Sequence, residues 1–106
     1  GYTLMGYFNH QVVVVIGIGD EIKNAHCNAL EFYDKVSDLI ASGTNGYFSF
    51  MLGCDGSKEG WDESNLQEEK RDRFIKWIEK KECFHWAVIN FPEDNNVWIE
   101  KSNYIE

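Results

Sequence analysis

The side chains most able to do chemistry are three cysteines and three histidines, and their spacing brings few of them together. His26 and Cys27 are neighbours in an expected helix, where successive side chains point about 100° apart, so the pair cannot act on one substrate atom. Cys83 and His85 would share one face of a strand, but a structural zinc ion needs four ligands and a catalytic one usually three. The sequence therefore predicts no metal site and no cofactor. A nucleophile–base pair stays open, drawn from Cys54 or Cys83 with His10 or His85.

The cysteines also bear on the compartment. Their number is odd, so they cannot form a closed disulfide framework within the chain. The longest apolar stretch, residues 12–18, is far shorter than the roughly 20 residues that span a bilayer, and it lacks the basic flank of a signal peptide. The sequence therefore predicts a cytoplasmic protein without a membrane segment.

Two glycines between a β-branched run and an expected helix suggest a phosphate-binding turn. Gly17 and Gly19 have the first spacing of such a turn, but the third glycine and a Walker lysine are missing. Asp20 and Glu21 would also place negative charge where a phosphate must bind. We interpret the pair as a tight strand-to-helix turn, with Asp20 as the N-cap of the helix.

The most unusual segment is a polar connection at residues 53–63, with three glycines, one tryptophan and five charged residues. Loops of this length are uncommon in small domains and are often functional. Trp61 is of a residue type enriched at contact hot spots, so the sequence predicts a protein contact; in the alternative, Trp61 packs back onto the following helix. The predicted contact residues are Asp55, Lys58, Glu59, Trp61, Asp62 and Glu63.

The charge excludes some partners. Ten basic and eighteen acidic side chains give a net charge of −8. Nucleic acids and anionic membranes are bound chiefly through basic side chains, so the composition excludes generic binding to either. Acidic side chains arrayed on helices and loops could instead imitate a phosphate backbone and occupy the nucleic-acid channel of another protein. Nucleic-acid mimicry is therefore one alternative function.

Hydrophobic patterning predicts four strands and two helices. Residues 12–16 are all apolar and β-branched, which predicts an interior strand covered on both faces. Apolar residues recur every three or four positions from 21 to 41, which predicts a helix that ends at Gly43. Residues 47–52 alternate, which predicts a strand. The remaining predicted elements are a helix at 65–81, headed by a capping box of Ser64 and Gln67, and a hairpin of strands 84–91 and 97–101.

The predicted order is therefore β-α-β-α-β-β, in a single α+β domain over residues 1–106. We expect a ferredoxin-like sandwich of two layers, with both helices on one face of a four-stranded sheet. Residues 1–4 precede Met5 and could be left over from cloning.

This architecture leaves one face of the sheet without cover. That face would present the valine run, Tyr47, Met51 and either Trp86 or Trp98. Exposed apolar patches above a few hundred Å² usually mark interaction sites, so we expect a homodimer or a partner protein. In the alternative, the same face forms a pocket for a nucleotide-like metabolite, lined by Tyr7, His10, Tyr47 and His85.

Two stretches of the chain resemble small uncharacterised phage-encoded proteins. The first is Met5-Gly6-Tyr7-Phe8-Asn9-His10. The second is Asn45-Gly46-Tyr47-Phe48-Ser49-Phe50, followed by Asp55-Gly56-Ser57-Lys58-Glu59-Gly60-Trp61 and an acidic run that leads into a helix with Trp77. The resemblance implies the cytoplasm of a host cell and a role in counteracting a host system, such as a defence system. It implies no catalytic residues.

The leading hypothesis is a non-enzymatic protein that binds and inhibits a host protein through residues 53–63 and the adjoining acidic helix. The second is a small nucleotide- or metabolite-binding domain, or an enzyme, that uses the open face of the sheet. The third is the nucleic-acid mimic, and the fourth is a homodimeric structural domain with no site.

Overall fold

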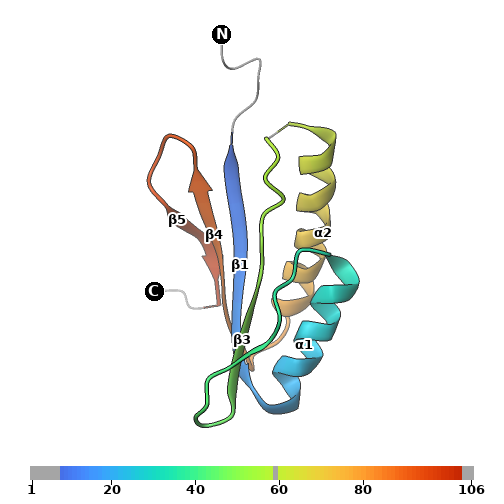
Figure 1. Ribbon diagram of the computed structural model, residues 1–106, viewed down its shortest axis with the longest axis vertical. Coiled ribbons are helices and arrows are strands. Elements are labelled where there is room, and N and C mark those ends of the chain that lie inside the picture. Colours follow the sequence, from blue (N-terminus) through green and yellow to red (C-terminus); the bar gives the residue numbers. More distant parts are fainter. Residues whose placement is uncertain (1–7, 59, 104–106) are drawn as a thin grey trace.

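The computed structural model describes residues 8–58 and 60–103 of the chain (Figure 1). The elements follow in the order β1 (Asn9–Ile18), α1 (Gly19–Phe32), β2 (Ile40–Ala41), β3 (Tyr47–Leu52), α2 (Asp62–Ile78), β4 (His85–Pro92) and β5 (Trp98–Ser102). Of the residues named above, Met5, Gly6, Tyr7 and Glu59 lie outside the described residues, as do residues 1–4. Among the described residues, no helix has the length and apolar character needed to cross a membrane.

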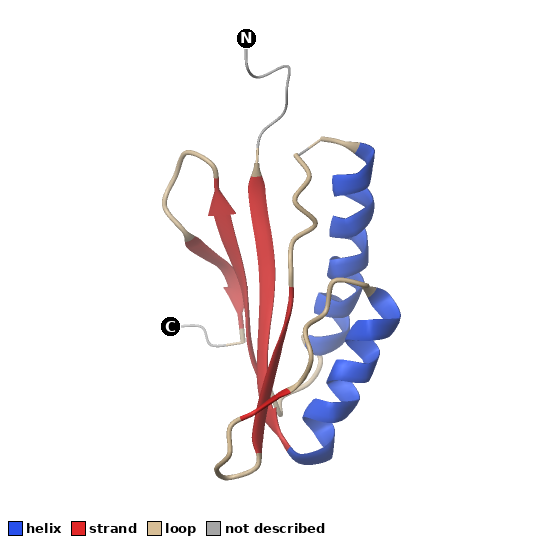
Figure 2. Cartoon of the chain, viewed as in Figure 1, coloured by secondary structure: helices blue, strands red, loops and turns tan. Residues whose placement is uncertain are grey.

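The strands form one antiparallel sheet in the order β2-β3-β1-β4-β5. Both helices lie on the same face of this sheet, so the fold has two layers (Figure 2). The predicted α+β class is confirmed. The finer prediction, a four-stranded ferredoxin-like sheet with the order β-α-β-α-β-β, is not fully matched, because β2 is an additional strand between α1 and β3.

The valine run forms the central strand, β1. It pairs with β3 on one side and β4 on the other, so Val13 lies opposite both Leu52 and Val88. Val13 is fully buried beneath the helices, whereas Val12 and Val14 point to the opposite face and are only half-buried. The interior position of this strand was predicted correctly, but helices cover only one of its faces.

Each helix packs onto the sheet through one apolar side. The buried apolar side chains of the helices are Ile22, Ala25, Ala29, Phe74, Ile75 and Ile78. Gly17 of β1 allows close packing at this interface, because a Cβ at this position would lie 2.9 Å from the Phe84 ring. A contact that short would force the ring or the strand to move.

The first helix is shorter than predicted, because α1 ends at Phe32 and not near residue 41. Tyr33 has extended backbone angles, and the segment that follows runs beside β3, which it contacts through an isolated bridge at Val36 and then through the strand β2. The Ser37 N–H donates to the Met51 carbonyl at 2.9 Å. The spacing of apolar residues continues the helical pattern past Phe32. Pairing with β3 satisfies the backbone hydrogen-bonding groups of this segment as well as a helix would.

The predicted helix ends are also wrong. Gly43 lies in the turn between β2 and β3, where its φ of +85° favours glycine, and it does not end a helix. Both helices begin before the predicted caps, and neither has a side-chain N-cap hydrogen bond. Asp20 therefore lies in the first turn of α1, and Ser64 and Gln67 lie inside α2, which spans residues 62–78 and not 65–81.

The predicted strand at residues 47–52 is confirmed as β3, and the C-terminal hairpin is confirmed with boundaries shifted by one residue. Neither tryptophan expected on the uncovered face lies there. Trp86 is buried in the core, and Trp98 pairs with Asn90, whose side chain is buried on the helix side of the sheet. The alternation along β4 places Trp86, Val88 and Asn90 on that side together.

Candidate functional site

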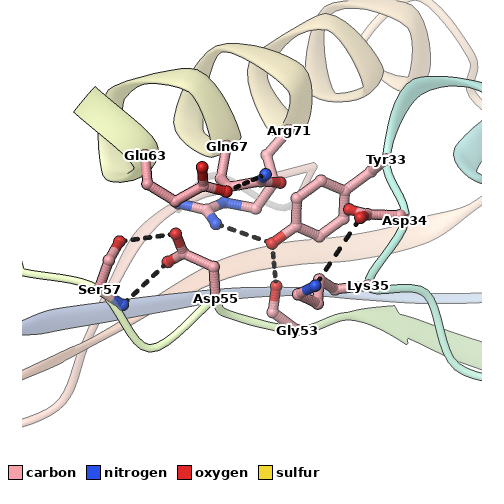
Figure 3. Close-up of polar contacts among 9 residues, drawn as sticks. All are labelled: Tyr33, Asp34, Lys35, Gly53, Asp55, Ser57, Glu63, Gln67 and Arg71. Atoms are coloured by element: carbon pink, nitrogen blue, oxygen red, sulfur yellow. Dashed lines mark hydrogen bonds and ion pairs between the residues drawn. The ribbon is translucent and has the colours of Figure 1, made fainter. Parts of the chain in front are cut away.

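The long connection between β3 and α2 is anchored at its start by a buried tyrosine. The Tyr33 hydroxyl donates to the Gly53 carbonyl at 2.6 Å and accepts a hydrogen bond from Arg71 Nη1 at 3.1 Å (Figure 3). Burial raises the pKa of the Tyr33 hydroxyl, against the opposing effect of the Arg71 guanidinium, so the tyrosine remains a neutral donor. The end of α1, the start of the loop and the middle of α2 are thus joined at one point.

The next part of the loop is held by its own side chains. The Asp55 carboxylate accepts hydrogen bonds from the Ser57 hydroxyl at 2.6 Å and from the Ser57 N–H at 3.3 Å (Figure 3). Gly56, between them, has a φ of +82°, which favours glycine. The Lys58 ammonium lies 5.3 Å from the centre of the Phe8 ring, at the start of β1. Asp55 and Lys58, two of the predicted contact residues, therefore make contacts within the chain.

Trp61 ends the loop and directly precedes α2. Its carbonyl accepts a hydrogen bond from the Asn65 N–H at 2.9 Å, while its side chain is 51% exposed. Asp62 and Glu63 follow in the exposed first turn of α2, where negative charge interacts favourably with the helix dipole. Glu63 accepts a hydrogen bond from the Gln67 amide at 2.7 Å. Trp61, Asp62 and Glu63 are thus three consecutive exposed residues where the loop meets α2, and we call this segment the Trp61 surface.

A partly buried polar network lies on the helix side of β1, β4 and β5; its Gln11 and Asn90 side chains are buried, whereas Glu100 is exposed. The Glu100 carboxylate accepts hydrogen bonds from the side-chain amides of Gln11 at 3.0 Å and Asn90 at 3.1 Å. The side-chain oxygen of Asn90, Oδ1, in turn accepts hydrogen bonds from the side-chain amides of Asn9 and Gln11, each at 3.2 Å. A carboxylate can only accept, so Glu100 determines which end of each amide donates. The side-chain amide oxygens of Asn9 and Gln11 are then left without a hydrogen-bond donor.

A polar pocket of about 110 Å³ lies next to this network. It is lined by Asn9, Gln11, Gly60, Ser64, Asn65, Glu68 and Arg71. Within the described part of the chain, four buried side-chain atoms here and beside it have no hydrogen-bond partner: Asn9 Oδ1, Gln11 Oε1, Gln67 Oε1 and Arg71 Nε. Unsatisfied buried polar atoms are costly, so this pocket is suited to water or to a small polar molecule.

The sequence did not predict this polar pocket. Arg71 and Gln67 are polar residues of α2, whose other buried residues are apolar. Their burial becomes visible only when the whole buried side of α2 is known. Gln11 precedes the valine run in β1 and Asn90 interrupts the apolar residues of β4. These two polar residues in otherwise apolar strands were the sequence features that could have indicated the polar pocket.

The predicted metabolite pocket is not assembled. His10 lies opposite Phe91 near one end of the sheet, and Tyr47 lies opposite Ile18 at the other. Eight residues of β1 separate these positions, a distance of about 26 Å at the rise of a strand. His85 lies opposite Ile16, near Tyr47 but far from His10, and Tyr7 is outside the described residues. These four side chains therefore cannot enclose one small ligand.

The raised pKa of the Cys83 thiol disfavours this cysteine as a nucleophile. All three cysteines are free thiols, and desolvation together with the nearby Glu21 carboxylate raises the pKa of Cys83, which lowers its thiolate fraction. His26, beside Cys27 in sequence, instead contacts the Ser37 carbonyl at 2.8 Å through Nε2. No group of three potential metal ligands occurs among the residues that the structure describes.

Comparison with known proteins adds no assignment. No family model, no curated protein and no solved structure matches this chain.

Proposed function

We propose that this chain is a non-enzymatic protein that binds a host protein through the Trp61 surface and inhibits it by covering its working surface. The observation that carries the proposal is the half-exposed indole of Trp61 at the end of an anchored loop. Tryptophan is enriched at binding hot spots, where a large apolar side chain fills a pocket on the partner. The anchored loop lowers the ordering cost of binding, because its start is already fixed by Tyr33 and Arg71.

The charge of the Trp61 surface indicates the chemistry of the partner. Asp62 and Glu63 directly follow Trp61, and Glu68 and Glu69 come later in α2; all four are exposed. Such a surface attracts a basic partner and accelerates its association. The partner that fits the Trp61 surface is therefore a protein with an apolar pocket surrounded by lysine or arginine side chains. A channel that normally binds nucleic acid has this character, so inhibition and mimicry would be one activity.

Affinity capture from a host lysate tests this proposal. Trp61→Ala should reduce the amount of captured partner by about 30-fold, which corresponds to a hot-spot contribution of about 2 kcal/mol. Leu30→Ala is the matched control, because Leu30 is an equally exposed apolar side chain on α1. A partner retained by wild type and Leu30→Ala but not by Trp61→Ala supports the proposal. Equal capture by all three proteins, or no specific capture, contradicts it.

The polar pocket favours a second candidate function, the binding of a small amide or ureido group. The free amide oxygens of Asn9 and Gln11, which line the pocket, would accept N–H donors, and Arg71 Nε would donate to a carbonyl oxygen. Acetamide and acetate have the same shape but differ in donors and charge. If the pocket takes such groups, acetamide should shift the side-chain amide signals of Asn9 and Gln11 saturably in NMR spectra, and acetate should not. No saturable response to acetamide, or an equal response to acetate, would contradict this candidate.

A further inference from the structure

The face of the sheet opposite the helices is apolar and has no cover in the described part of the chain (Figure 2). We call it the outer face. The strand registers assign to it every second residue of β1, β3 and β4, together with Ile99 of β5. Its large apolar side chains are Val12, Val14, Ile16, Ile18, Tyr47, Met51, Ile89, Phe91 and Ile99. We propose that a second copy of this chain covers the outer face, sheet against sheet.

The distribution of charge favours a second copy as the occupant. The outer-face positions of the four strands carry no aspartate, glutamate, lysine or arginine, although the whole chain has a net charge of −8. A partner attracted by the acidic charge would bind where that charge lies, on the helices and loops. The outer face instead matches a surface that is equally apolar and uncharged, and an identical face meets this requirement.

Packing sheet against sheet also keeps the charged layers of two copies apart. Stacked sheets lie about 10 Å from each other, and each helix layer lies about 10 Å behind its own sheet. The two helix layers would therefore be about 30 Å apart, several times the Debye length of about 8 Å at physiological salt. Repulsion between two chains of charge −8 is thus weakened at physiological salt, and it grows as the salt concentration falls.

The area of the outer face is close to what a dimer needs. Four strands with a spacing of about 4.8 Å and a mean length of about 24 Å present a projected area of about 460 Å². Two copies would then bury about 900 Å² of projected area together, close to the lower limit of about 1,000 Å² for a specific interface. A shallow apolar hollow of about 270 Å³, lined in part by Val14, Ile16, Ala87 and Ile99, could receive a protruding side chain of the second copy.

Light scattering across a range of protein concentrations tests the dimer. Wild type should have twice the 12.3 kDa mass of one chain. Ile16→Lys places a charge on the central strand of the outer face, beside its apolar hollow, and should return the mass to that of one chain. Leu30→Lys is the matched control, since it places the same charge at an exposed apolar position on α1, and it should remain dimeric. Met51→Lys, on the neighbouring strand β3, should also give the mass of one chain. It replaces Ile16→Lys in the experiment if Ile16→Lys fails to fold.

Two outcomes would overturn the proposal. A wild type that has the mass of one chain at all concentrations would show that no second copy binds. A dimer that survives both lysine substitutions in folded variants would place the interface elsewhere. Neither outcome bears on the proposed role of Trp61, because Trp61→Ala is tested by capture of a host protein and not by the mass of the chain.

Discussion

Tyr33 is the residue on which the geometry of the loop depends most. Tyr33→Phe would leave the Gly53 carbonyl and Arg71 Nη1 without their shared partner, at a cost of about 1–3 kcal/mol in the free energy of unfolding. Chemical denaturation of the variant and wild type measures this cost. Tyr47→Phe is the control, because Tyr47 is 40% exposed in one chain whereas Tyr33 is buried, and it should change the free energy by less than about 0.5 kcal/mol.

The same tyrosine should make stability depend on alkaline pH. Its pKa in the folded chain is raised above the ordinary value of 10.0 by burial, so the unfolded chain loses this proton first. The free energy of unfolding should therefore fall as pH rises above about 10 and continue to fall until the folded-state pKa is passed. The difference between wild type and Tyr33→Phe in pH titrations of stability isolates this effect. If that difference stays constant from pH 8 to 11, the hydroxyl is not held in its neutral form.

Gly17 sets how closely β1 and α1 can pack. In Gly17→Ala, the new methyl group would lie 2.9 Å from the Phe84 ring and 3.2 Å from Ile22, so overpacking should cost about 1–3 kcal/mol. Gly53→Ala is the matched control, because its Cβ would meet its neighbours at an ordinary 3.8 Å. Thermal unfolding should show a lower midpoint for Gly17→Ala only. Equal midpoints for the two variants would contradict the close packing.

At the scale of elements, the segment after α1 has the most informative conformation. As a strand beside β3, it should protect only those amides that face β3, such as those of Ser37 and Ser42, from hydrogen exchange. A helix over the same residues would protect consecutive amides. Residue-resolved exchange measured by NMR distinguishes the two patterns, and continuous protection from residue 34 to 41 would contradict the observed strand.

This segment also shows what the sequence could and could not predict. β1 and β3 were predicted because their patterns are strong and local, whereas the apolar spacing at Val36 and Ile40 fitted a helix and a strand equally well. Pairing with β3, at Leu52 for Val36 and at Ser49 for Ile40, decided between them. Trp61 could be identified from its residue type and loop, but the burial of Arg71 depends on Tyr33, 38 residues away. Such long-range partners leave no pattern in one sequence.

At the scale of the whole molecule, the two proposed surfaces differ in the force that drives binding, so salt should affect them in opposite directions. The Trp61 surface attracts a basic partner across water, and this attraction is screened as ionic strength rises. The outer face carries no charge, and its two copies bring together chains that are each at −8, so screening removes a repulsion. Raising NaCl from 50 to 500 mM should therefore weaken capture of the partner several-fold and strengthen the dimer several-fold. Pull-down and light scattering at the two salt concentrations measure both responses, and a dimer that dissociates at high salt would mean that ion pairs hold it together.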